Sequence, residues 1–324
     1  INEMPRTPHL IEKAAKELEH FKFNRSIWQN IALKNLAKES NYSYKQFIKL
    51  VNIVKKNQMS KFTVSINYPL LEVYTAIMRV SLKHQKYAEE FKQRIKDLDF
   101  IQNIYFSGQR KVTFILRFRA LSYKQLKQFT DKIRKAGEDI IVYTNTSLVN
   151  KTFIEEGKIY RAGETISKPK VDAVDFEIIR QLQIDAHQPL SVIAKKVNLR
   201  EPTVHRRIRK LKESGVIVGY HIVRQWKNIP DKFHPIAAFC EINSNVAFDD
   251  SKIFDLPSVK NKKIHVRFLY EAFGINNRLF SIAASNMISF RKFVHEELTN
   301  MPGVIYVKAY FILESENRTI RFCP

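Results

Sequence analysis

The sequence is poor in the residues on which many enzymes and metal proteins depend. Only two cysteines, Cys240 and Cys323, occur among 324 residues, which excludes a disulfide framework and a cysteine-rich zinc site. The eight glycines never form G-x-G, G-x-x-x-x-G-K or G-x-S-x-G, and the nine histidines never form H-x-x-x-H. These absences argue against dinucleotide, P-loop, hydrolase and metal sites. We therefore expect no cofactor, no metal and no enzyme activity.

Long apolar runs are also missing. No stretch approaches the roughly 18 residues that cross a bilayer. The first residues, INEMPRTPHL, lack the apolar centre of a signal peptide. We expect a cytoplasmic protein that does not associate with membranes, and the scarcity of cysteine fits a reducing compartment.

Acidic residues are few relative to basic ones. The chain carries 55 Lys and Arg against 32 Asp and Glu, a net charge of +23. A field of this size attracts polyanions and supports sequence-independent contact with phosphates. Charge alone does not separate DNA from RNA or from anionic lipid.

The most informative segment is 190–220, LSVIAKKVNLREPTVHRRIRKLKESGVIVGY. Its first part predicts a short helix, with the small Ala194 where this helix crosses the second one. A tight turn at Asn198 and Leu199 follows. Pro202 suits the first turn of a second helix, and Gly215 suits its end. Strand character then resumes. The segment predicts a winged helix-turn-helix, with the second helix placed to enter a major groove.

The second helix would bury an apolar stripe and expose a cationic face. We expect Thr203, His205, Arg206 and Arg209 to contact bases and the groove, and Arg207 and Lys210 to contact phosphate. Arg200, just before the helix, is a further candidate. The alternative is an ordinary solvated basic face, but that would not account for the turn, the small Ala194 and the wing together.

A fainter copy of this segment appears 157 residues earlier, where Leu33 falls on Leu190. Ala37 then aligns with Ala194 and Asn41 with Asn198, and the apolar stripe is preserved. Ser43 is a good N-cap residue for the second helix of this copy. The candidate DNA-contacting residues here are Ser43, Tyr44, Lys45, Gln46 and Lys49. This copy is less charged, and it either contacts DNA or has become a packing element.

A similar α/β pattern follows each helix-turn-helix. Strand and helix periodicities alternate in the order β-α-β-β-α-β, the ferredoxin-like arrangement. We predict an α+β fold of two winged helix-turn-helix domains alternating with two ferredoxin-like domains. The expected boundaries are 1–67, 70–150, 171–228 and 233–320, with a linker at 151–170.

This order resembles the Lrp/AsnC family of archaeal and bacterial transcription regulators, most closely over 171–220. The family's loop appears as Asp185-Ala186-His187-Gln188-Pro189, and its second-helix pattern as Thr203-Val204-His205-Arg206-Arg207-Ile208. The resemblance implies binding to double-stranded DNA and homo-oligomerisation through the ferredoxin-like domains. Because one chain holds two such halves, it further implies a covalent pseudo-dimer that suits two unlike half-sites.

The family's small-molecule site is a G-x-x-D pattern on a hairpin. Here the corresponding positions hold Gly108 to Lys111 in the first half, and Gly274, Ile275, Asn276 and Asn277 in the second. Lys111 cannot accept a hydrogen bond from an ammonium group, whereas Asn277 retains an amide oxygen. Two interpretations stay open: plain hairpin turns, which we favour, or an amino-acid effector held by Gly274, Asn276 and Asn277.

Other functions compete with sequence-specific regulation. An architectural, chromatin-like DNA binder with little sequence preference would also use the excess positive charge. Some Lrp-like proteins, including fused pairs, are sirohaem decarboxylases, but the cationic face of 201–213 disfavours that alternative. RNA binding is disfavoured because the aromatic residues mostly fall on core stripes.

Overall fold

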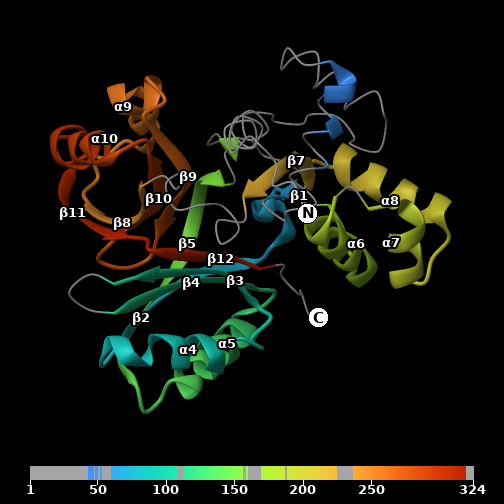
Figure 1. Ribbon diagram of the computed structural model, residues 1–324, viewed down its shortest axis with the longest axis horizontal. Helices are drawn as coiled ribbons and strands as arrows, with labels where there is room; N and C mark the ends of the chain where they lie inside the picture. The colour runs from blue at the N-terminus through green and yellow to red at the C-terminus, as the bar shows by residue number, and fades with distance from the viewer. Residues whose placement is uncertain are drawn as a thin grey trace, which may run out of the picture. The chain divides into compact units, whose positions relative to one another are not determined.

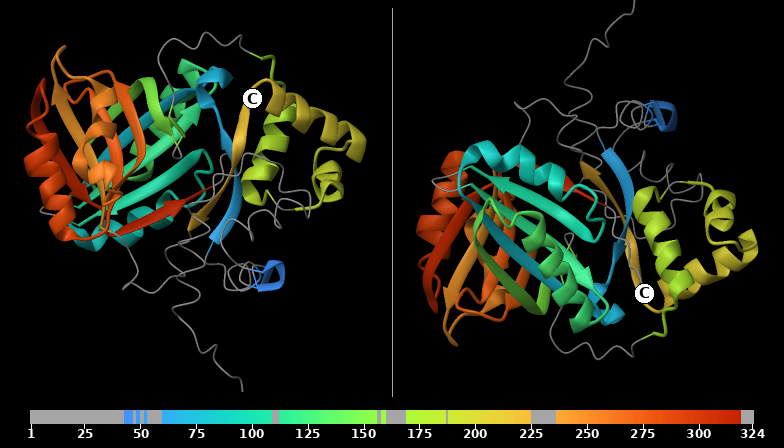
Figure 2. Two further views of the ribbon diagram at one scale, coloured as in Figure 1. Left: turned by 90° about the horizontal axis from the view of Figure 1, so that it is seen from above. Right: turned by 90° about the horizontal axis from the view of Figure 1, so that it is seen from below.

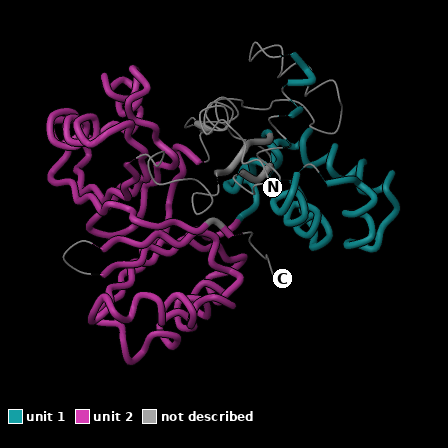
Figure 3. The backbone as a smooth tube through the Cα atoms, viewed as in Figure 1, with its two compact units in different colours: residues 1–72, 167–234, 321–324 teal, residues 73–166, 235–320 magenta. Residues whose placement is uncertain are grey.

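The computed structural model describes residues 43–46, 48–49, 52, 60–108, 112–155, 158–159, 169–186, 188–224 and 236–318. The chain divides into two compact units (Figure 3). Unit 1 holds 1–72, 167–234 and 321–324, and unit 2 holds 73–166 and 235–320. Most of the first expected helix-turn-helix lies outside the described residues. Among the described residues, no helix is long and apolar enough to span a membrane.

Unit 1 combines helices with a two-stranded ribbon (Figure 1). Its elements are β1 (Ser60–Ile66), η1 (Tyr68–Leu71), α6 (Ala173–Ile184), α7 (Leu190–Lys196), α8 (Glu201–Glu213) and β7 (Ile217–Arg224). Strands β1 and β7 are antiparallel, with Ser60 opposite Arg224, and they run side by side in both views of Figure 2. The strand predicted after the second helix is therefore present, and its partner comes from the first half of the sequence.

Unit 2 contains two successive segments of the same element order. The first comprises β2 (Tyr74–Leu82), η2 (Gln85–Tyr87), α4 (Ala88–Arg94), β3 (Ile101–Ser107), β4 (Thr113–Ala120), α5 (Tyr123–Ala136) and β5 (Ile141–Glu155). The second comprises β8 (Ile236–Ser244), η5 (Asp250–Asp255), α9 (Pro257–Lys260), β9 (Ile264–Ala272), β10 (Arg278–Ala284), α10 (Met287–Arg291), η6 (Lys292–Leu298) and β11 (Val304–Phe311). The short strands β6 (Lys158–Ile159) and β12 (Glu314–Asn317) complete the unit.

Both segments have the strand arrangement of a ferredoxin-like sheet. The spatial order is β5-β2-β4-β3 in the first and β11-β8-β10-β9 in the second. In each, the first and third strands are central and the helices cover one face (Figure 1). The predicted α+β class and the β-α-β-β-α-β order are therefore present.

Within the described residues, one pairing joins these sheets into a ten-stranded sheet, and a second pairing adds a strand at its edge. The second part of the long strand β5 pairs with β9, for example Thr152 with Tyr270. The C-terminal strand β12 pairs with β3, with Ser315 opposite Tyr105. Strand β5 ends the first segment and extends the sheet of the second. Strand β12 follows the last strand of the second segment and extends the sheet of the first.

The pairing of β5 corrects the expected linker at 151–170. Residues 151–155 belong to β5, because their backbone groups bond to β9 rather than to water. Residues 158–159 form β6, which pairs with β5. A local composition of charge and glycine indicates a loop, but here a strand more than 100 residues away supplies the hydrogen-bond partners.

Successive residues along the strands face opposite sides of the sheet. One side packs against the helices and forms the outer core, and the other side forms the inner core. Met78 of β2 packs with the helices α4 and α5, whereas its neighbour Ile77 faces the opposite side. The inner core gathers apolar residues from both segments: Ile77, Tyr105, Ile115, Phe239, Phe268, Tyr270, Ala272, Leu279 and Tyr310. Because both faces of these strands are buried, successive residues along them are buried, including the polar Arg117 and Arg119 of β4.

Two helical regions depart from their sequence patterns. Helical spacing of the apolar residues continues over 86–99, but α4 stops at Arg94, because turns at 95–100 carry the chain to β3. The poorly patterned stretch near 251–259 forms two short helices separated at Leu256. That residue is extended because it precedes Pro257, and the residue before a proline disfavours the helical region.

Candidate nucleic-acid interface

Helix α6 begins at a reciprocal cap. The Asp172 carboxylate accepts from the backbone N–H of Asp175 at 2.8 Å, and the Asp175 side chain accepts from the N–H of Asp172. This is a capping box built from two acids. The sequence signal was the D-x-x-D spacing at 172–175, which we did not single out.

The turn between α7 and α8 has the geometry expected of Asn198 and Leu199. Asn198 has a φ of 53°, in the left-handed region that asparagine tolerates better than most residues. The N–H of Leu199 then bonds to the carbonyl of Ala194 at 3.0 Å. Ala194 is buried where the two helices meet, so a larger side chain would push them apart.

Helix α8 begins and ends as the sequence predicts. Pro202 occupies its first turn, where a missing N–H costs no hydrogen bond. Gly215 follows its last turn with a φ of +73°, a conformation that favours glycine. Val204, Ile208 and Leu211 are buried along one side of the helix.

The opposite side of α8 carries the cations. Arg200 before the helix and four side chains on it are exposed: His205, Arg206, Arg209 and Lys210. Thr203 is half-buried beside them. Only Arg209 of this group has an ion pair within the described residues, a 3.7 Å contact with Glu213 along the same exposed face. The surface therefore presents donors outward, as a groove-binding helix requires.

Arg207 lies apart from this face. Its Nη1 donates to the carboxylates of Asp172 and Asp175, both at 2.8 Å, so it ties α8 to the start of α6. The hydrogen bonds to Asp175 and Asp172 raise the pKa of Arg207. Burial raises the pKa of Asp172, but the Asp175 N–H and Arg207 outweigh it, and the net shift is downward. The expected phosphate contact of Arg207 would have to compete with two carboxylates.

Lys212 does not belong to the exposed cationic side of α8. It lies half-buried on the helix, and desolvation lowers its pKa. The cations that face solvent are therefore those predicted from helical spacing, with Arg207 as the exception.

Unit 1 also supports α6 with residues from the first half of the sequence. Thr63 of β1 donates to the carbonyl of Gln183 at 3.2 Å, and the Gln183 amide donates to the Tyr68 hydroxyl at 2.7 Å. The N–H of Asn67 bonds to the carbonyl of Val216 at 2.8 Å. These partners are more than 110 residues apart, so no local sequence pattern indicates them.

The candidates of the first helix-turn-helix are described only in part. Residues 44–46, 48–49 and 52 are helical. Ser43 caps them, because its hydroxyl accepts from the N–H of Gln46 at 3.3 Å and its own N–H donates to the Gln46 side chain. Gln46 thus forms a capping box with Ser43. Lys45 and Lys49 are exposed and Tyr44 is half-buried.

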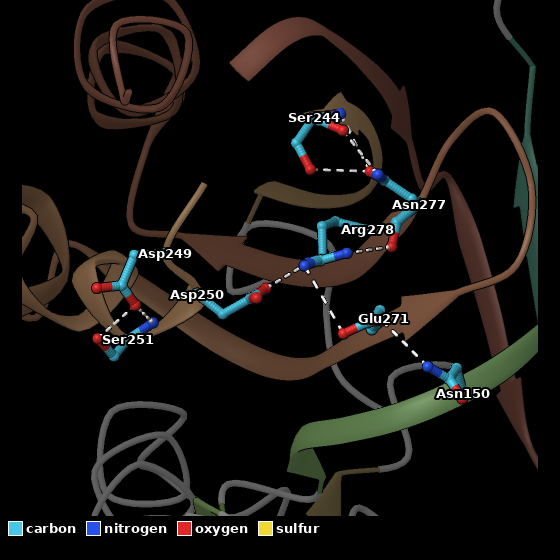
Figure 4. Close-up of polar contacts among 8 residues, drawn as sticks. All are labelled: Asn150, Ser244, Asp249, Asp250, Ser251, Glu271, Asn277 and Arg278. Atoms are coloured by element: carbon cyan, nitrogen blue, oxygen red, sulfur yellow. Dashed lines mark hydrogen bonds and ion pairs between the residues drawn. The ribbon is translucent and has the colours of Figure 1, made fainter. Parts of the chain in front are cut away.

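The hairpin weighed as an effector site has its polar side chains bonded to other residues of the protein (Figure 4). The Asn277 side chain accepts from the N–H of Ser244 and donates to its carbonyl, at 3.0 and 2.7 Å. Asn276 donates to Glu241 and accepts from Tyr306. Gly274 has a φ of +129°, which the turn requires.

A neighbouring cluster in the same figure holds the hairpin in place. Arg278 donates to Asp250 at 2.7 Å and to the Asn277 carbonyl at 3.0 Å, and it lies 3.7 Å from Glu271. Glu271 in turn accepts from Asn150 of β5 at 3.0 Å. Desolvation raises the pKa of Asp250 despite its contact with Arg278. The amides of Asn276 and Asn277 are thus part of the packing of the hairpin itself.

Comparison with known proteins adds to this geometry. The AsnC-type helix-turn-helix domain matches residues 171–212, which span α6 to α8. The leucine-responsive regulatory protein of Rhizobium meliloti is 32% identical over 144 residues, 44% of this chain and 89% of that protein. The chain belongs to the Lrp/AsnC family of transcription regulators. The HTH-type transcriptional regulator FL11 of Pyrococcus horikoshii is 28% identical over 149 residues, 46% of this chain and 93% of that regulator.

A solved structure matches nearly the whole chain. The sirohaem decarboxylase NirDL aligns with a TM-score of 0.57 over 97% of this chain and 94% of its own, at 12% identity. At this identity the likeness concerns the fold alone. It shows that a chain with this complete set of elements occurs in another protein of known structure.

Proposed function

We propose that this chain is a transcription regulator that binds double-stranded DNA sequence-specifically through α8. The observation that supports it most is that α8 has one side packed in unit 1 and an opposite, exposed side that carries cations. One side packs on α6 and α7, Arg207 holds it to Asp172 and Asp175, and the outward side presents His205, Arg206, Arg209 and Lys210. A rigidly held helix with an outward cationic face is what groove recognition needs.

We assign separate tasks to the candidate residues. Thr203, His205, Arg206 and Arg209 contact bases and groove edges, and Arg200 and Lys210 contact phosphate. Arg207 positions the helix through its two carboxylate partners. Lys45 and Lys49, with Tyr44, form a weaker second contact, while Ser43 and Gln46 cap that helix.

We further propose that the two halves act as a covalent pseudo-dimer of Lrp/AsnC-like halves. The pairings of β1 with β7, β5 with β9 and β12 with β3 support it, because each joins one half of the sequence to the other. The two helix-turn-helix segments would then address unlike half-sites about one DNA turn apart. Further association of chains would use the outer surfaces of unit 2, and an amino-acid effector is not needed for binding.

The second candidate is an architectural DNA binder, which the net charge of +23 favours. Both candidates predict strong salt dependence, so affinity at one salt concentration does not separate them. Enzymatic activity is not part of the proposal, because the curated relatives are named as regulators and the NirDL likeness concerns the fold.

Selection from a randomised duplex pool at several salt concentrations separates the two candidates. Recovery of a motif, with two unlike half-sites about one turn apart, would support the regulator and the pseudo-dimer. Uniform recovery with a steep salt slope would replace it with the architectural binder. Failure to bind duplex DNA at low salt would overturn both.

A further inference from the structure

The outward side of α5 (Tyr123–Ala136) is strongly cationic. The helix covers one face of the sheet of the first segment, and its apolar residues Leu126, Phe129 and Ile133 pack into the outer core there (Figure 1). Its exposed residues include five basic side chains and one acidic: Lys124, Lys127, Lys132, Arg134 and Lys135 against Asp131. The apolar side of α5 is therefore already occupied, and the side that remains open carries charge.

Four of these cations are free of neighbouring acids. Arg134 is the exception, because it lies 3.8 Å from Asp131 and donates to the Thr144 hydroxyl at 3.3 Å. Within the part of the chain that the structure describes, the other four take part in no ion pair and no side-chain hydrogen bond; we call them the α5 lysines: Lys124, Lys127, Lys132 and Lys135.

The helix beside α5 in the same outer core has its cations neutralised. Helix α4 carries two basic side chains near its end, Lys92 and Arg94. They form ion pairs with four acidic residues: Glu89, Glu90, Asp139 and Glu314. The unpaired positive charge is therefore a property of α5 and not of both helices.

The equivalent helix of the second segment has no excess of charge. In α10 and η6, Arg291 and Lys292 are matched by Glu296 and Glu297, so two basic residues less two acidic ones leave a formal charge of zero. For α5, five basic residues less one acidic one leave +4. A segment of this fold therefore does not require a cationic helix at this position.

The charges are also placed at a cost to the helix. Lys124 lies in the first turn, which holds no acidic residue and where the helix dipole disfavours a cation. Lys124 and Lys127 are three residues apart, as are Lys132 and Lys135, so like charges are neighbours on the helix surface. An anionic partner would offset this repulsion.

The chemistry of the surface fits the phosphate backbone of duplex DNA. Lysine ammonium groups contact phosphates as point charges and carry no information about sequence. Single-stranded RNA needs aromatic platforms, and on α5 Tyr123 is the only exposed aromatic residue. An anionic membrane needs an exposed apolar side beside the cations, but that side of α5 is buried. A second copy of the chain would bring like charges together.

We propose that the α5 lysines contact the phosphate backbone of the DNA duplex that α8 binds, outside the sequence that α8 recognises. The proposal rests on the proposed function for its duplex, and it adds a contact from unit 2 that is independent of sequence. Helix α8 then supplies selectivity, and the α5 lysines supply affinity. Because the two surfaces belong to one chain, binding through one raises the effective concentration of the other.

Removal of the four charges from the full-length chain tests this contact. The variant combines Lys124→Gln, Lys127→Gln, Lys132→Gln and Lys135→Gln, and glutamine is a good helix former. Fluorescence anisotropy at several salt concentrations measures binding to a duplex of about four helical turns that carries the selected motif. The slope of log affinity against log salt should fall by about 0.9 for each lost contact, up to about 3.6 for four. Affinity at about 0.1 M salt should fall at least tenfold. The ratio of affinities for the motif and for a scrambled duplex should not change.

A matched control removes the same charge from exposed lysines of unit 2 outside α5: Lys96→Gln, Lys252→Gln, Lys263→Gln and Lys292→Gln. This control should keep the slope and the affinity of the parent protein. Arginine at the four α5 positions preserves the charge and should also bind as the parent does. If the α5 glutamine variant loses no more affinity than the control, the contact does not exist, while selection of a motif through α8 stands.

Failure of the proposed function gives a different result. Equal affinity of the parent protein for motif and scrambled duplexes, with the loss in the α5 variant preserved, would remove sequence specificity and support the α5 contact. Vesicles of phosphatidylglycerol are the second probe. If the α5 variant loses binding to vesicles and keeps its affinity for the duplex, the surface binds lipid and the inference is overturned. If the parent protein binds no duplex at low salt, both proposals are overturned.

Discussion

Arg206 and Arg207 are adjacent in the sequence and lie in opposite environments. Arg206 is exposed on α8, whereas Arg207 flanks the buried stripe and bonds to two carboxylates of α6. Helical spacing assigned both to an outward cationic face. It could not separate them, because the partners of Arg207 lie 32 and 35 residues earlier in the chain.

At the residue scale, Arg206→Ala should flatten discrimination between DNA sites. A bidentate contact to a base contributes about 1–3 kcal/mol to discrimination, and its loss is specific to one position. Lys210→Ala should instead weaken all sites alike and lower the slope of log affinity against log salt by about 0.9. Binding to the selected motif and to single-base variants measures both effects. Unchanged discrimination in Arg206→Ala would remove this residue from the base-contacting set.

Arg207→Gln should weaken folding of unit 1 in a pH-dependent way. The pKa of Asp172 is lowered in the folded protein, so the carboxylate contributes stability above its unfolded pKa of about 3.9 and loses it as the pH falls below that value. The variant should therefore be less stable than the parent protein at pH 7, and the difference should be smaller at pH 3. Urea unfolding at both pH values measures the difference. A constant difference across this range would show that the carboxylates do not act through Arg207.

At the element scale, the β1–β7 ribbon and η1 connect the first half of the sequence to α6. Tyr68 and Gln183 are both buried, and the hydrogen bond between them is 2.7 Å long. Thr63 of β1 and Tyr68 of η1 therefore supply hydrogen-bond partners to Gln183 at the end of α6.

Tyr68→Phe should destabilise unit 1 by about 1–3 kcal/mol, since the Gln183 amide would lose a buried partner. Tyr123→Phe is the matched control, because that side chain is exposed on α5. Urea unfolding followed by circular dichroism measures both variants. Equal stabilities of the two variants would contradict the role assigned to the Tyr68 hydroxyl.

Elements that depend on nearby residues could be predicted, and those that depend on distant partners could not. The limits of α8 follow from Pro202 and Gly215, and its faces follow from helical spacing. Strand β12 was not expected, because four residues with two glutamates give no strand pattern and its partner β3 lies more than 200 residues earlier.

At the scale of the whole molecule, the shared strands predict cooperative unfolding of unit 2. The reactivity of Cys240 measures this unfolding. Its thiol is fully buried in the core between the helices and the sheet of the second segment, and burial raises its pKa. In a Cys323→Ser background, Cys240 should resist a thiol reagent in native conditions. Its reactivity should rise with denaturant together with the loss of the strand signal in circular dichroism. Reaction well before that loss would show that the second segment opens alone.

The division of β5 between two sheets also has a consequence for synthesis. The edge of β5 that pairs with β9 stays open until Ile264–Ala272 leaves the ribosome, and the outer edge of β3 stays open until β12 at Glu314–Asn317 follows. At about 5–20 residues per second, a nascent chain would carry an unpaired strand edge for several seconds. Unpaired edges are sites of wrong association. We therefore expect neighbouring chains on a polysome to compete for these edges, so that the spacing of nascent chains affects the yield of correctly paired protein.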